Sequence, residues 1–590
     1  MRYFYLEGRK NERNIYRDLY CGEVNKTHVG KKLKLAGWVN SIRNLGGLLF
    51  ITLRDETGIV QLISEEGDKY NSLTRESTIT ITGTVHSRTK DMINPNMKTG
   101  EIEVAIESLE VLGESLNVLP FEINHSKDAS EETRLKYRYL DLRNEQIHNN
   151  IILRSKVIDF IRTTMKDMNF TEIQTPIIST SSPEGARDFV IPSRKFKGKF
   201  YALPQAPQIY KQLLMVSGFN KYFQIAPCFR DEDCRADRTL EFYQLDFEMS
   251  FATEEDVYKT GERIFYDIFT NFSDKEVSKT PFKRIPYREA MLKYGSDKPD
   301  LRNPLIIEDL TDILSLADFA PFKDTTIRAI KVSSIDKSNS WFKQMEEYTK
   351  TLGGTLGYIK VNEDMTFKSS LDKFLNDDIR NKLKDRLSLT SGNIIFIVAN
   401  QNKEKCAKIL GQLRIKLGNE LDLLKKNCYE FCIINDFPMY EYNEETNTWD
   451  FGHNPFSMPK GGMESLKNSN IEDILAYQYD FVCNGCEMSS GAIRNHSISI
   501  MKKAFELAGY DEETIKNKFR SLYTAFQYGA PPHAGMAPGI DRIIMLLTGE
   551  ENLREVQVFP PNVSGQDTLM GGPNELTEQQ LRELHIKIRD

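Results

Sequence analysis

Apolar and polar residues alternate along the chain between about residues 33 and 107. A period of two is the pattern of a strand with one buried and one solvent-facing side. Short polar breaks divide this region into five such segments, so the sequence predicts five consecutive strands. The alternating positions are Leu33, Leu35, Gly37 and Val39; Leu49, Ile51 and Leu53; Ile59, Val60 and Ile63; Ile79, Ile81, Gly83 and Val85; and Ile102, Val104 and Ile106.

Five short strands in a row are typical of a small β-barrel of the OB-fold type, a common platform for single-stranded nucleic acid. Any other small barrel would show the same alternation. Stacking on a base requires an exposed aromatic ring on a strand, and Phe50 is the candidate because its parity is opposite to that of Leu49, Ile51 and Leu53. The sequence therefore predicts that Phe50 points outward from the barrel.

The pattern then changes to helical spacing. A charged connector from Pro120 to Arg143 leads into a predicted helix over about residues 146–168, and a strand that carries Pro176 follows. An ordinary core helix would show the same apolar stripe. The stripe consists of Ile147, Ile151, Ile158, Ile161, Met165 and Met168.

Mixed patterns predict a further domain between Asn303 and about Lys425, where no residue combination suggests chemistry. Strands are predicted over 356–361 and 394–399, and a helix over 403–417. A last helix is predicted near 577–588. The chain contains no internal repeats or low-complexity segments.

A chain of 590 residues is too long for one hydrophobic core, so three or more domains are expected. The longest clearly apolar run, Ile394 to Ala399, is far shorter than the roughly 20 residues of a membrane span. Met1 to Tyr20 is rich in Arg, Lys, Glu and Tyr and lacks the apolar core of a secretory signal. We therefore expect a soluble, cytoplasmic protein with no membrane partner.

The eight cysteines do not suggest a disulfide framework, and we expect free thiols. Cys483-Asn484-Gly485-Cys486 is a CxxC pair without a second pair of suitable spacing, so small buried side chains are favoured and no zinc is expected. The formal net charge of −7 gives no support to a nucleic-acid partner. Short basic islands such as Lys31-Lys32-Leu33-Lys34 are usually solvated faces.

Two short strings about 310 residues apart each place a permanent cation beside carboxylates in an apolar setting: Phe229-Arg230-Asp231-Glu232 and Gly539-Ile540-Asp541-Arg542. Arginine suits bidentate contact with phosphate or carboxylate. No GxxxxGK[ST] loop occurs, and no GxGxxG follows a strand, so arginines must hold any nucleotide phosphates. Taken singly, each string is equally well explained as a structural ion pair.

Further segments accompany the two strings in a fixed order. Together they resemble the class II aminoacyl-tRNA synthetases, and within them the aspartyl-tRNA synthetases of bacterial type, over almost the whole chain. The segments are Glu172-Ile173-Gln174-Thr175-Pro176-Ile177-Ile178, Ser182-Pro183-Glu184-Gly185-Ala186-Arg187-Asp188, Tyr201-Ala202-Leu203-Pro204-Gln205, Arg235-Ala236-Asp237-Arg238, Glu241-Phe242-Tyr243-Gln244-Leu245-Asp246 and Pro531-Pro532-His533-Ala534-Gly535.

The resemblance implies an α+β multidomain architecture. It contains an OB-fold β-barrel that binds the anticodon, a catalytic core built on an antiparallel sheet, and an inserted α/β domain of bacterial type. The implied ranges are an N-terminal extension at 1–20, the barrel at 21–115, a linker at 116–145, the core at 146–302 and 426–590, and the insertion at 303–425.

The resemblance also implies the reaction. The α-carboxylate of L-aspartate attacks the α-phosphorus of ATP in line, which forms aspartyl-adenylate and releases pyrophosphate, and aspartate then passes to the 3′-terminal adenosine of tRNA. Positioning and charge stabilisation supply most of the catalysis, and no protein nucleophile is required. By resemblance, Arg230 bridges the aspartate carboxylate and the α-phosphate, Glu232 reads the adenine amino group, and Arg542 lies against the γ-phosphate.

Phe242 is expected to stack on adenine, although a phenylalanine there is equally compatible with a core position. Other ATP contacts are expected from Asp231, Thr239, Glu487, Gly539, Ile540 and Asp541.

Asp480 and Glu487 are the expected ligands of Mg²⁺, because hard divalent cations prefer carboxylate and phosphate oxygens. On an unbroken strand, residues seven apart would face opposite sides. Asn484-Gly485 between them forms either a two-residue turn or a bulge, and either can restore a common face. The resemblance favours the bulge.

Lys211 and Arg494 are the expected clamp on the aspartate β-carboxylate, and two cations there separate an aspartate pocket from an asparagine or lysine pocket. Glu184, Gln208 and Asp246 are expected to receive the substrate ammonium directly or through water.

His453 is expected to sense the carboxylate as an imidazolium, although a lone histidine two residues before a proline is more often structural. Ala206, Thr239 and Asn454 depart from the usual bacterial pattern without removing an essential charge.

The partners implied by the resemblance are tRNA for aspartate and a second copy of the chain, which would pack against the helix over 146–168 and the strand carrying Pro176. At the position of Leu45, the chain resembles enzymes restricted to tRNA for aspartate. Enzymes that also charge tRNA for asparagine often carry histidine at that position. Anticodon contacts are expected from Arg43, Leu45, Phe50, Gln61 and Glu103.

Two alternatives remain open at this point. An asparaginyl or lysyl enzyme shares the barrel and the three motifs, but Lys211, Arg494 and the insertion argue against it. A nucleic-acid-binding module with a degenerate catalytic domain is disfavoured because the charged residues of the site are retained.

Overall fold

The computed structural model describes residues 13–181, 185–333 and 335–589. The chain divides into two compact units between Ala129 and Ser130. Glu184 and most of the predicted N-terminal extension lie outside the described residues.

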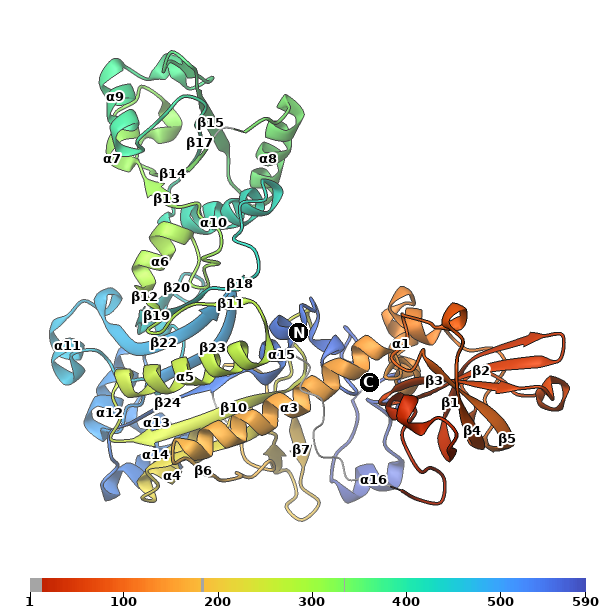
Figure 1. Cartoon of the computed structure of the whole chain (residues 1–590). Coiled ribbons are helices and arrows are strands. Elements are labelled where there is room, and N and C mark those ends of the chain that lie inside the picture. Colours follow the sequence, from red (N-terminus) through yellow and green to blue (C-terminus); the bar gives the residue numbers. More distant parts are fainter. Residues whose placement is uncertain (1–12, 182–184, 334, 590) are drawn as a thin grey trace. The chain divides into compact units, whose positions relative to one another are not determined.

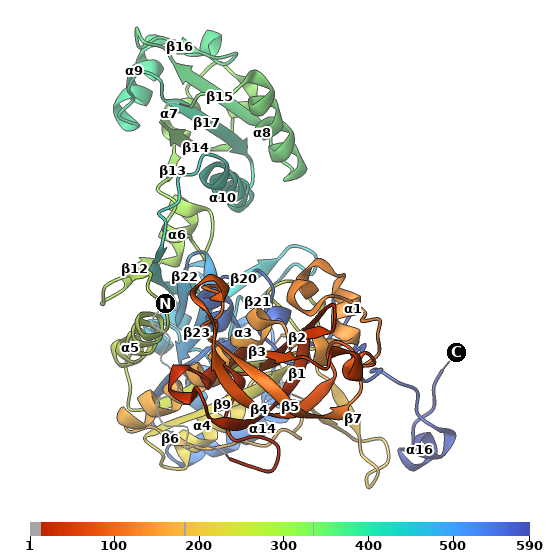
Figure 2. The same ribbon diagram turned by 45° about the vertical axis from the view of Figure 1, so that its right-hand side comes forward.

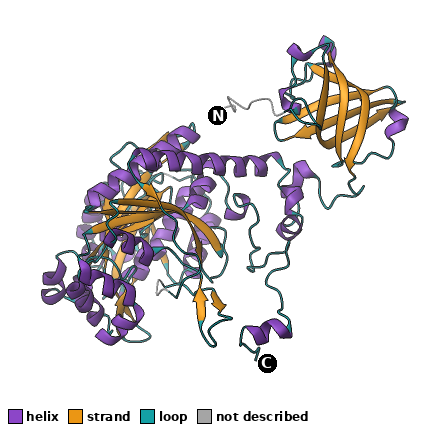
Figure 3. Ribbon diagram, turned by 90° about the horizontal axis from the view of Figure 1, so that it is seen from below, coloured by secondary structure: helices purple, strands orange, loops and turns teal. Residues whose placement is uncertain are grey.

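The first unit is a closed five-stranded barrel, in the strand order β1-β2-β3-β5-β4 (Figure 3). Alternate residues of each strand fill its core, and Leu49, Ile51 and Leu53 are almost completely buried. The predicted OB-fold barrel is confirmed, and Phe50 lies between these positions on the outer side, half-buried. The strands are β1 (Lys32–Leu45), β2 (Leu48–Asp55), β3 (Gly58–Ser64), β4 (Thr78–Ser87) and β5 (Ile102–Gly113).

The second unit is built on an eight-stranded sheet, in the order β12-β19-β22-β23-β24-β10-β9-β6. Its neighbours are antiparallel except for the outermost pairs, β12 with β19 and β6 with β9. The strands are β6 (Thr171–Glu172), β9 (Lys221–Phe229), β10 (Glu241–Ser250), β12 (Lys283–Pro286), β19 (Phe431–Pro438), β22 (Leu475–Cys483), β23 (Cys486–Ile493) and β24 (His533–Pro538).

Two long helices, α3 (Glu145–Asp167) and α5 (Glu254–Phe272), and the nine-residue α15 (Ile540–Thr548) cover one face of this sheet (Figure 1). The observed α3 matches the helix predicted over 146–168. Aromatic rings dominate the core beneath these helices, where Phe282 stacks on Phe431 at 4.7 Å between ring centroids. The opposite face is left to shorter helices and to the cavity described below. Those helices are α4 (Gln208–Val216), α11 (Gly462–Asn468), α12 (Ile498–Leu507), α13 (Glu512–Lys518) and α14 (Arg520–Ala525).

A five-stranded sheet interrupts the core sequence, in the order β13-β14-β17-β15-β16. Helices α7 (Thr311–Leu314) and α9 (Asp377–Arg386) cover one face, while α8 (Asn339–Thr351) and α10 (Lys403–Glu420) cover the other (Figure 2). Helix α10 also packs against α6 (Tyr287–Tyr294) of the core. The strands are β13 (Ile307–Asp309), β14 (Thr326–Val332), β15 (Leu356–Val361), β16 (Phe367–Lys368) and β17 (Ile394–Asn400).

Two predicted elements are shorter than expected. The strand expected to carry Pro176 ends as β6 at Glu172. Beyond it the Ile173 N–H still donates to the Phe223 carbonyl, but the Thr175 N–H turns to the Gln224 side chain. The last helix, α16, spans only Glu578–Glu583, because His585 adopts a left-handed backbone with φ of 58°.

Short helices and two-stranded ribbons complete the fold. All eight cysteines are free thiols, and within the described ranges no helix is long and apolar enough to cross a membrane. The remaining strands and helices are α1 (Glu131–Lys136), α2 (Arg138–Asp141), β7 (Val190–Pro192), β8 (Phe200–Ala202), β11 (Glu276–Val277), β18 (Cys428–Tyr429), β20 (Tyr440–Asn443) and β21 (Thr448–Phe451).

Candidate active site

A cavity of about 460 Å³ lies on the face of the large sheet opposite its long helices. Residues from β10, β22, β23, β24, α4 and α15 line it, so segments distant in sequence meet there. The predicted site residues in its lining are Gln208, Lys211, Arg230, Glu232, Thr239, Phe242, His453, Asp480, Glu487, Arg494, Gly539, Asp541 and Arg542.

Arg230 follows the last residue of β9 and is held by its backbone N–H, which donates to the Leu240 carbonyl at 2.9 Å. Its guanidinium lies 5.0 Å from the centre of the Phe242 ring. The Arg230 Nε is buried and makes no hydrogen bond in the part of the chain that the structure describes. Buried donors are almost always paired, so this atom is available to a ligand.

Glu232 pairs with Arg238, whose Nη1 donates to Glu232 Oε2 at 2.8 Å. The sequence assigned Arg238 no role, although it stands in the same segment and lines the cavity. Asp231 does not line the cavity. The Asp231 N–H donates to the Arg187 carbonyl at 3.0 Å, and Arg187 Nε donates to the Asp231 carbonyl at 3.3 Å. The Asp231 side chain is exposed.

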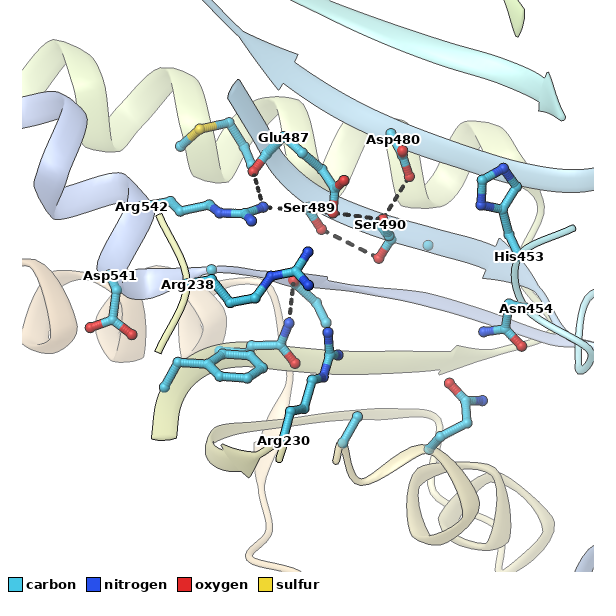
Figure 4. Close-up of a pocket in the computed structure, with 18 of the residues that line it drawn as sticks. Arg230, Arg238, His453, Asn454, Asp480, Glu487, Ser489, Ser490, Asp541 and Arg542 are labelled. Atoms are coloured by element: carbon cyan, nitrogen blue, oxygen red, sulfur yellow. Dashed lines mark hydrogen bonds and ion pairs between the residues drawn. The ribbon is translucent and has the colours of Figure 1, made fainter. Parts of the chain in front are cut away.

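The string Gly539 to Arg542 opens helix α15. Asp541 is buried and accepts a hydrogen bond from the Tyr243 backbone N–H at 3.0 Å and another from Arg154, so it fixes the helix to β10 and α3. Ile540 is fully buried in the core and does not line the cavity. Arg542 projects into the cavity, where its Nη1 donates to the Glu487 carbonyl at 2.8 Å (Figure 4).

Asp480 and Glu487 come from a hairpin that combines both devices considered for the sequence. Asn484 and Gly485 have φ of 52° and 83° and form the two-residue turn. The bulge is elsewhere: Val482 pairs with Glu487 and Phe481 with Ser489, so Met488 is the extra residue. The preference for a bulge at Asn484-Gly485 was wrong, because those residues provide the turn.

Ser490 joins the two carboxylates. Its hydroxyl donates to Asp480 Oδ1 at 2.7 Å and lies 3.2 Å from Glu487 Oε1 (Figure 4). Burial and the neighbouring Glu487 raise the pKa of Asp480. Burial also acts to raise the pKa of Glu487, but Lys298 and Arg542 bring it below its ordinary value.

Lys298 is a site residue that the sequence analysis missed. It comes from the loop after α6, and its Nζ lies 3.2 Å from Glu487 Oε2 and 3.8 Å from Asp480 Oδ2. No group of three His, Cys, Asp or Glu side chains suited to a metal occurs among the described residues. Two carboxylates bridged by a hydroxyl nevertheless fit a hard cation that takes its other ligands from phosphate and water.

Four charged side chains form a buried cluster at the inner end of the cavity. Lys211 Nζ lies 2.6 Å from Asp246 Oδ1, and Arg494 Nε lies 2.9 Å from Glu248 Oε1. All four are at most 3 % exposed, so each charge requires its partner. Glu248 was missed, although two carboxylates two residues apart on an apolar strand must face the same side. Asp246 lies behind Lys211 and does not line the cavity.

The buried cations keep donors for a ligand. Arg494 uses Nε and Nη2 for Glu248, and its Nη1 makes no hydrogen bond within the described ranges. Gln208 Nε2 and Gln478 Oε1 are buried there without a partner in the same part of the structure. These atoms would bind a polar ligand.

His453 stands at the edge of the cavity with its ring 5.0 Å from that of Phe437. Loss of hydration lowers the pKa of His453, and Lys298 acts in the same direction. An imidazolium beside a bound carboxylate stays a prediction.

The barrel carries the other predicted residues on its outer surface. Arg43 pairs with Phe50 across β1 and β2, and Gln61 donates to Glu103 Oε2 at 3.0 Å. Leu45 is 67 % exposed beside the turn Gly46-Gly47. These residues present a ring and hydrogen-bonding groups at one side of the barrel and its β1–β2 tip.

Comparisons with known proteins agree with this architecture. Residues 130–563 match the family described as tRNA synthetases class II (D, K and N), and residues 33–112 match an OB-fold nucleic acid binding domain. A protein of Rickettsia akari named aspartate–tRNA(Asp/Asn) ligase is 52% identical over 97% of this chain and 98% of its own. One of Streptomyces coelicolor named aspartate–tRNA ligase is 50% identical over 97% and 99%.

Solved structures share the fold at low sequence identity. The asparaginyl-tRNA synthetase of Pyrococcus horikoshii with asparaginyl-adenylate has a TM-score of 0.58 at 19% identity and covers 92% of this chain and 97% of its own. The aspartyl-tRNA synthetase of Entamoeba histolytica has a TM-score of 0.54 at 19% identity and covers 91% and 89%.

Proposed function

The chain belongs to the class II tRNA synthetases of the aspartate, lysine and asparagine group, and we propose that it is an aspartate–tRNA ligase. The observation that carries the choice of aspartate is the pair of buried cations, Lys211 and Arg494, in the same cavity as Arg230. A carboxylate offers two acceptor oxygens to the remaining donors of these side chains, an asparagine amide offers one, and a lysine ammonium, which only donates, offers none.

The adenylation step needs two anions brought together. Arg230, with its free Nε, would bridge the aspartate α-carboxylate and the α-phosphate, while Arg542 and Arg238 would lie along the phosphates. The ring of Phe242 offers a stacking face for adenine, with Glu232 beside it to accept from the amino group. Arg542 and Arg238 would stabilise the negative charge that develops on the leaving pyrophosphate.

Asp480, Glu487 and the Ser490 hydroxyl would hold Mg²⁺ beside the phosphates. When bound, the cation supplies Lewis-acid polarisation of phosphate oxygens. Gln208 would receive the substrate ammonium through its amide oxygen, together with Asp246 directly or through water. Glu184 remains a prediction, since it lies outside the described residues.

Selection of tRNA would fall to the barrel. Phe50 is available to stack on an anticodon base, and Arg43, Gln61 and Glu103 are within the same surface. The relatives differ in the tRNAs that their names include. The name of the Rickettsia protein includes tRNA for both Asp and Asn, whereas the name of the Streptomyces protein does not mention Asn. From Leu45 we infer restriction to tRNA for aspartate.

A homodimer would cover the edge of the large sheet. The sheet ends at β6, and beyond it Ile177 and Ile178 are 46% and 60% exposed. Exposed apolar side chains beside an unpaired sheet edge favour burial against another chain. That the enzyme works in the cytoplasm stays a prediction from sequence.

Transfer of labelled aspartate to isolated tRNAs tests the function. We expect charging of tRNA for aspartate, no incorporation of asparagine or lysine, and much slower charging of tRNA for asparagine. Substitution of Leu45→His should reduce the ratio between the two tRNAs and leave adenylate formation unchanged. Equal charging by the unsubstituted enzyme would show that Leu45 does not discriminate, and binding of tRNA without any charging would favour a degenerate nucleic-acid-binding module.

A further inference from the structure

The loop over residues 295–306 connects helix α6 to β13, the first strand of the inserted domain, and it brings Lys298 into the cavity. The Lys298 backbone N–H donates to the Ser296 hydroxyl at 3.0 Å, and its ammonium donates to Asp297 Oδ2 at 2.5 Å. These contacts fold the loop back on itself. The side chain then extends to the two carboxylates of the β22–β23 hairpin.

The Lys298 ammonium stands between those carboxylates, at 3.2 Å from Glu487 and 3.8 Å from Asp480. A cation held by both Asp480 and Glu487 would occupy the same space. An ammonium and a divalent cation that contact the same two carboxylates repel each other strongly in a partly buried site, so both cannot remain there. The Lys298 side chain is 31% exposed, so it has room to move toward the cavity.

The backbone of this loop is fixed by the inserted domain. Arg414 of α10 is almost fully buried and donates to the carbonyls of Asp300, Asn303 and Leu305 at 3.0, 2.7 and 2.6 Å. Gly411 of the same helix packs closely on Gly295: a Cβ atom on Gly411 would lie 2.4 Å from the Gly295 carbonyl oxygen. Movement of the ammonium is therefore a rotation of the side chain, with the loop held in place.

We propose that Lys298 is an internal counter-ion of the cation site that becomes a phosphate-binding residue during the reaction. The inference rests on the proposed function. Its ammonium holds Asp480 and Glu487 in the free enzyme and competes with the divalent cation for them. Once displaced, it contacts the phosphates of ATP, which the arginines of the same cavity would hold.

This arrangement couples the cation to the nucleotide. Without ATP, a divalent ion must displace an ammonium whose other ion pair among the described residues is with Asp297, so the ion binds weakly. With ATP, the phosphates stabilise both the ion and the displaced ammonium. The free enzyme thus avoids the repulsion of two adjacent carboxylates without retaining a metal.

Binding of Mn²⁺ without ATP, aspartate or tRNA, followed by electron paramagnetic resonance, tests the competition directly. Lys298→Met removes the charge and keeps the aliphatic stem, and we expect it to bind Mn²⁺ roughly tenfold or more tightly than the unsubstituted enzyme. The matched control is Lys293→Met, because Lys293 pairs with Glu289 on the surface of α6. It should bind as the unsubstituted enzyme does.

The second arm measures ATP-dependent pyrophosphate exchange. Lys298→Met should raise the KM for ATP and lower kcat, roughly tenfold in kcat/KM, while Lys298→Arg should recover part of both. Unchanged or weaker Mn²⁺ binding by Lys298→Met, and equally by Lys298→Gln should the first variant not fold, would overturn the competition. Unchanged kinetics for ATP would overturn the phosphate role. The Mn²⁺ arm needs no aspartate, so a wrong substrate assignment leaves its outcome intact.

Discussion

Arg494 is held by the buried carboxylate of Glu248 before any ligand arrives. The two charges, together with Lys211 and Asp246, balance one another, so the pocket presents free donors and no net charge. Specificity for a carboxylate then depends on the direction of the remaining N–H groups. The charge of Arg494 and the shape of its fork can therefore be tested separately.

Arg494→Lys keeps the charge beside Glu248 and removes the planar fork. We expect kcat/KM for aspartate in pyrophosphate exchange to fall roughly 10²-fold or more, with the KM for ATP nearly unchanged. Arg494→Ala should additionally lower the unfolding free energy by about 3–5 kcal/mol, because it leaves buried Glu248 with only the longer 3.6 Å contact to Lys211, which already pairs with Asp246. Thermal unfolding separates the two effects, and near-normal use of aspartate by Arg494→Lys would refute the clamp.

Phe50→Ala tests the outward face of the barrel. Stacking one base is worth about 1–3 kcal/mol, so charging efficiency with tRNA should fall roughly 5- to 150-fold while adenylate formation stays the same. Val111→Ala is the control, because Val111 is 42% exposed on β5 and has no assigned contact. Loss of both steps, or loss of barrel stability, would make Phe50 a structural residue.

Residues within the quoted motifs could be assigned from the sequence, because their order and spacing identify them. Lys298 could not, since nothing in the pattern around Ser296 and Asp297 says that this loop returns to the hairpin carrying Glu487. Arg238 belongs to a segment that the resemblance identified, but its ion pair with Glu232 depends on how the turn between them folds. Glu248 was the avoidable omission, because strand periodicity places it beside Asp246.

At the scale of elements, the β22–β23 hairpin shows what a local pattern can and cannot decide. Asn-Gly is a strong signal for a two-residue turn, and the turn is there. The bulge at Met488 leaves no such signature, because it is set by pairing with β22 and β24. Helix boundaries of α3 and α10 were close to expectation, since apolar stripes against a core define them.

Arg414 connects two elements, helix α10 of the inserted domain and the loop that carries Lys298. Arg414→Met should leave three carbonyls without their donor, loosen residues 295–303 and cost about 2–4 kcal/mol of stability. Hydrogen exchange should become faster in that loop. In pyrophosphate exchange, the KM for ATP should rise. Lys416→Met on the same helix, where Lys416 pairs with exposed Glu420, is the control. Unchanged exchange in the loop would argue against the connection.

At the scale of the whole molecule, the division of labour follows the two units. The barrel, with its own core, carries the residues proposed to read the anticodon, and the second unit contains every residue proposed for adenylation. The barrel was readable from its alternating pattern, whereas the ranges of the core and the insertion came from the resemblance. Sheet order could not be read from the sequence, since it depends on contacts between distant segments.

Association of two chains is testable at this scale. Sedimentation should give about twice the chain mass of 68.0 kDa. Ile178→Asp places a charge beside the open sheet edge and should shift the enzyme toward monomer, whereas Val118→Asp, at a position that is 83% exposed in the linker, should not. A monomer for the unsubstituted protein, or a dimer unaffected by Ile178→Asp, would place the interface elsewhere or remove it.

Activation of aspartate in this cavity is measured most directly by ATP–pyrophosphate exchange of the purified protein without tRNA, with aspartate, asparagine and lysine supplied in turn. We expect exchange that depends on aspartate and on a divalent cation, at a kcat/KM at least roughly 10²-fold above that for asparagine or lysine. Exchange driven equally well by asparagine or by lysine, or no exchange with aspartate, would contradict it.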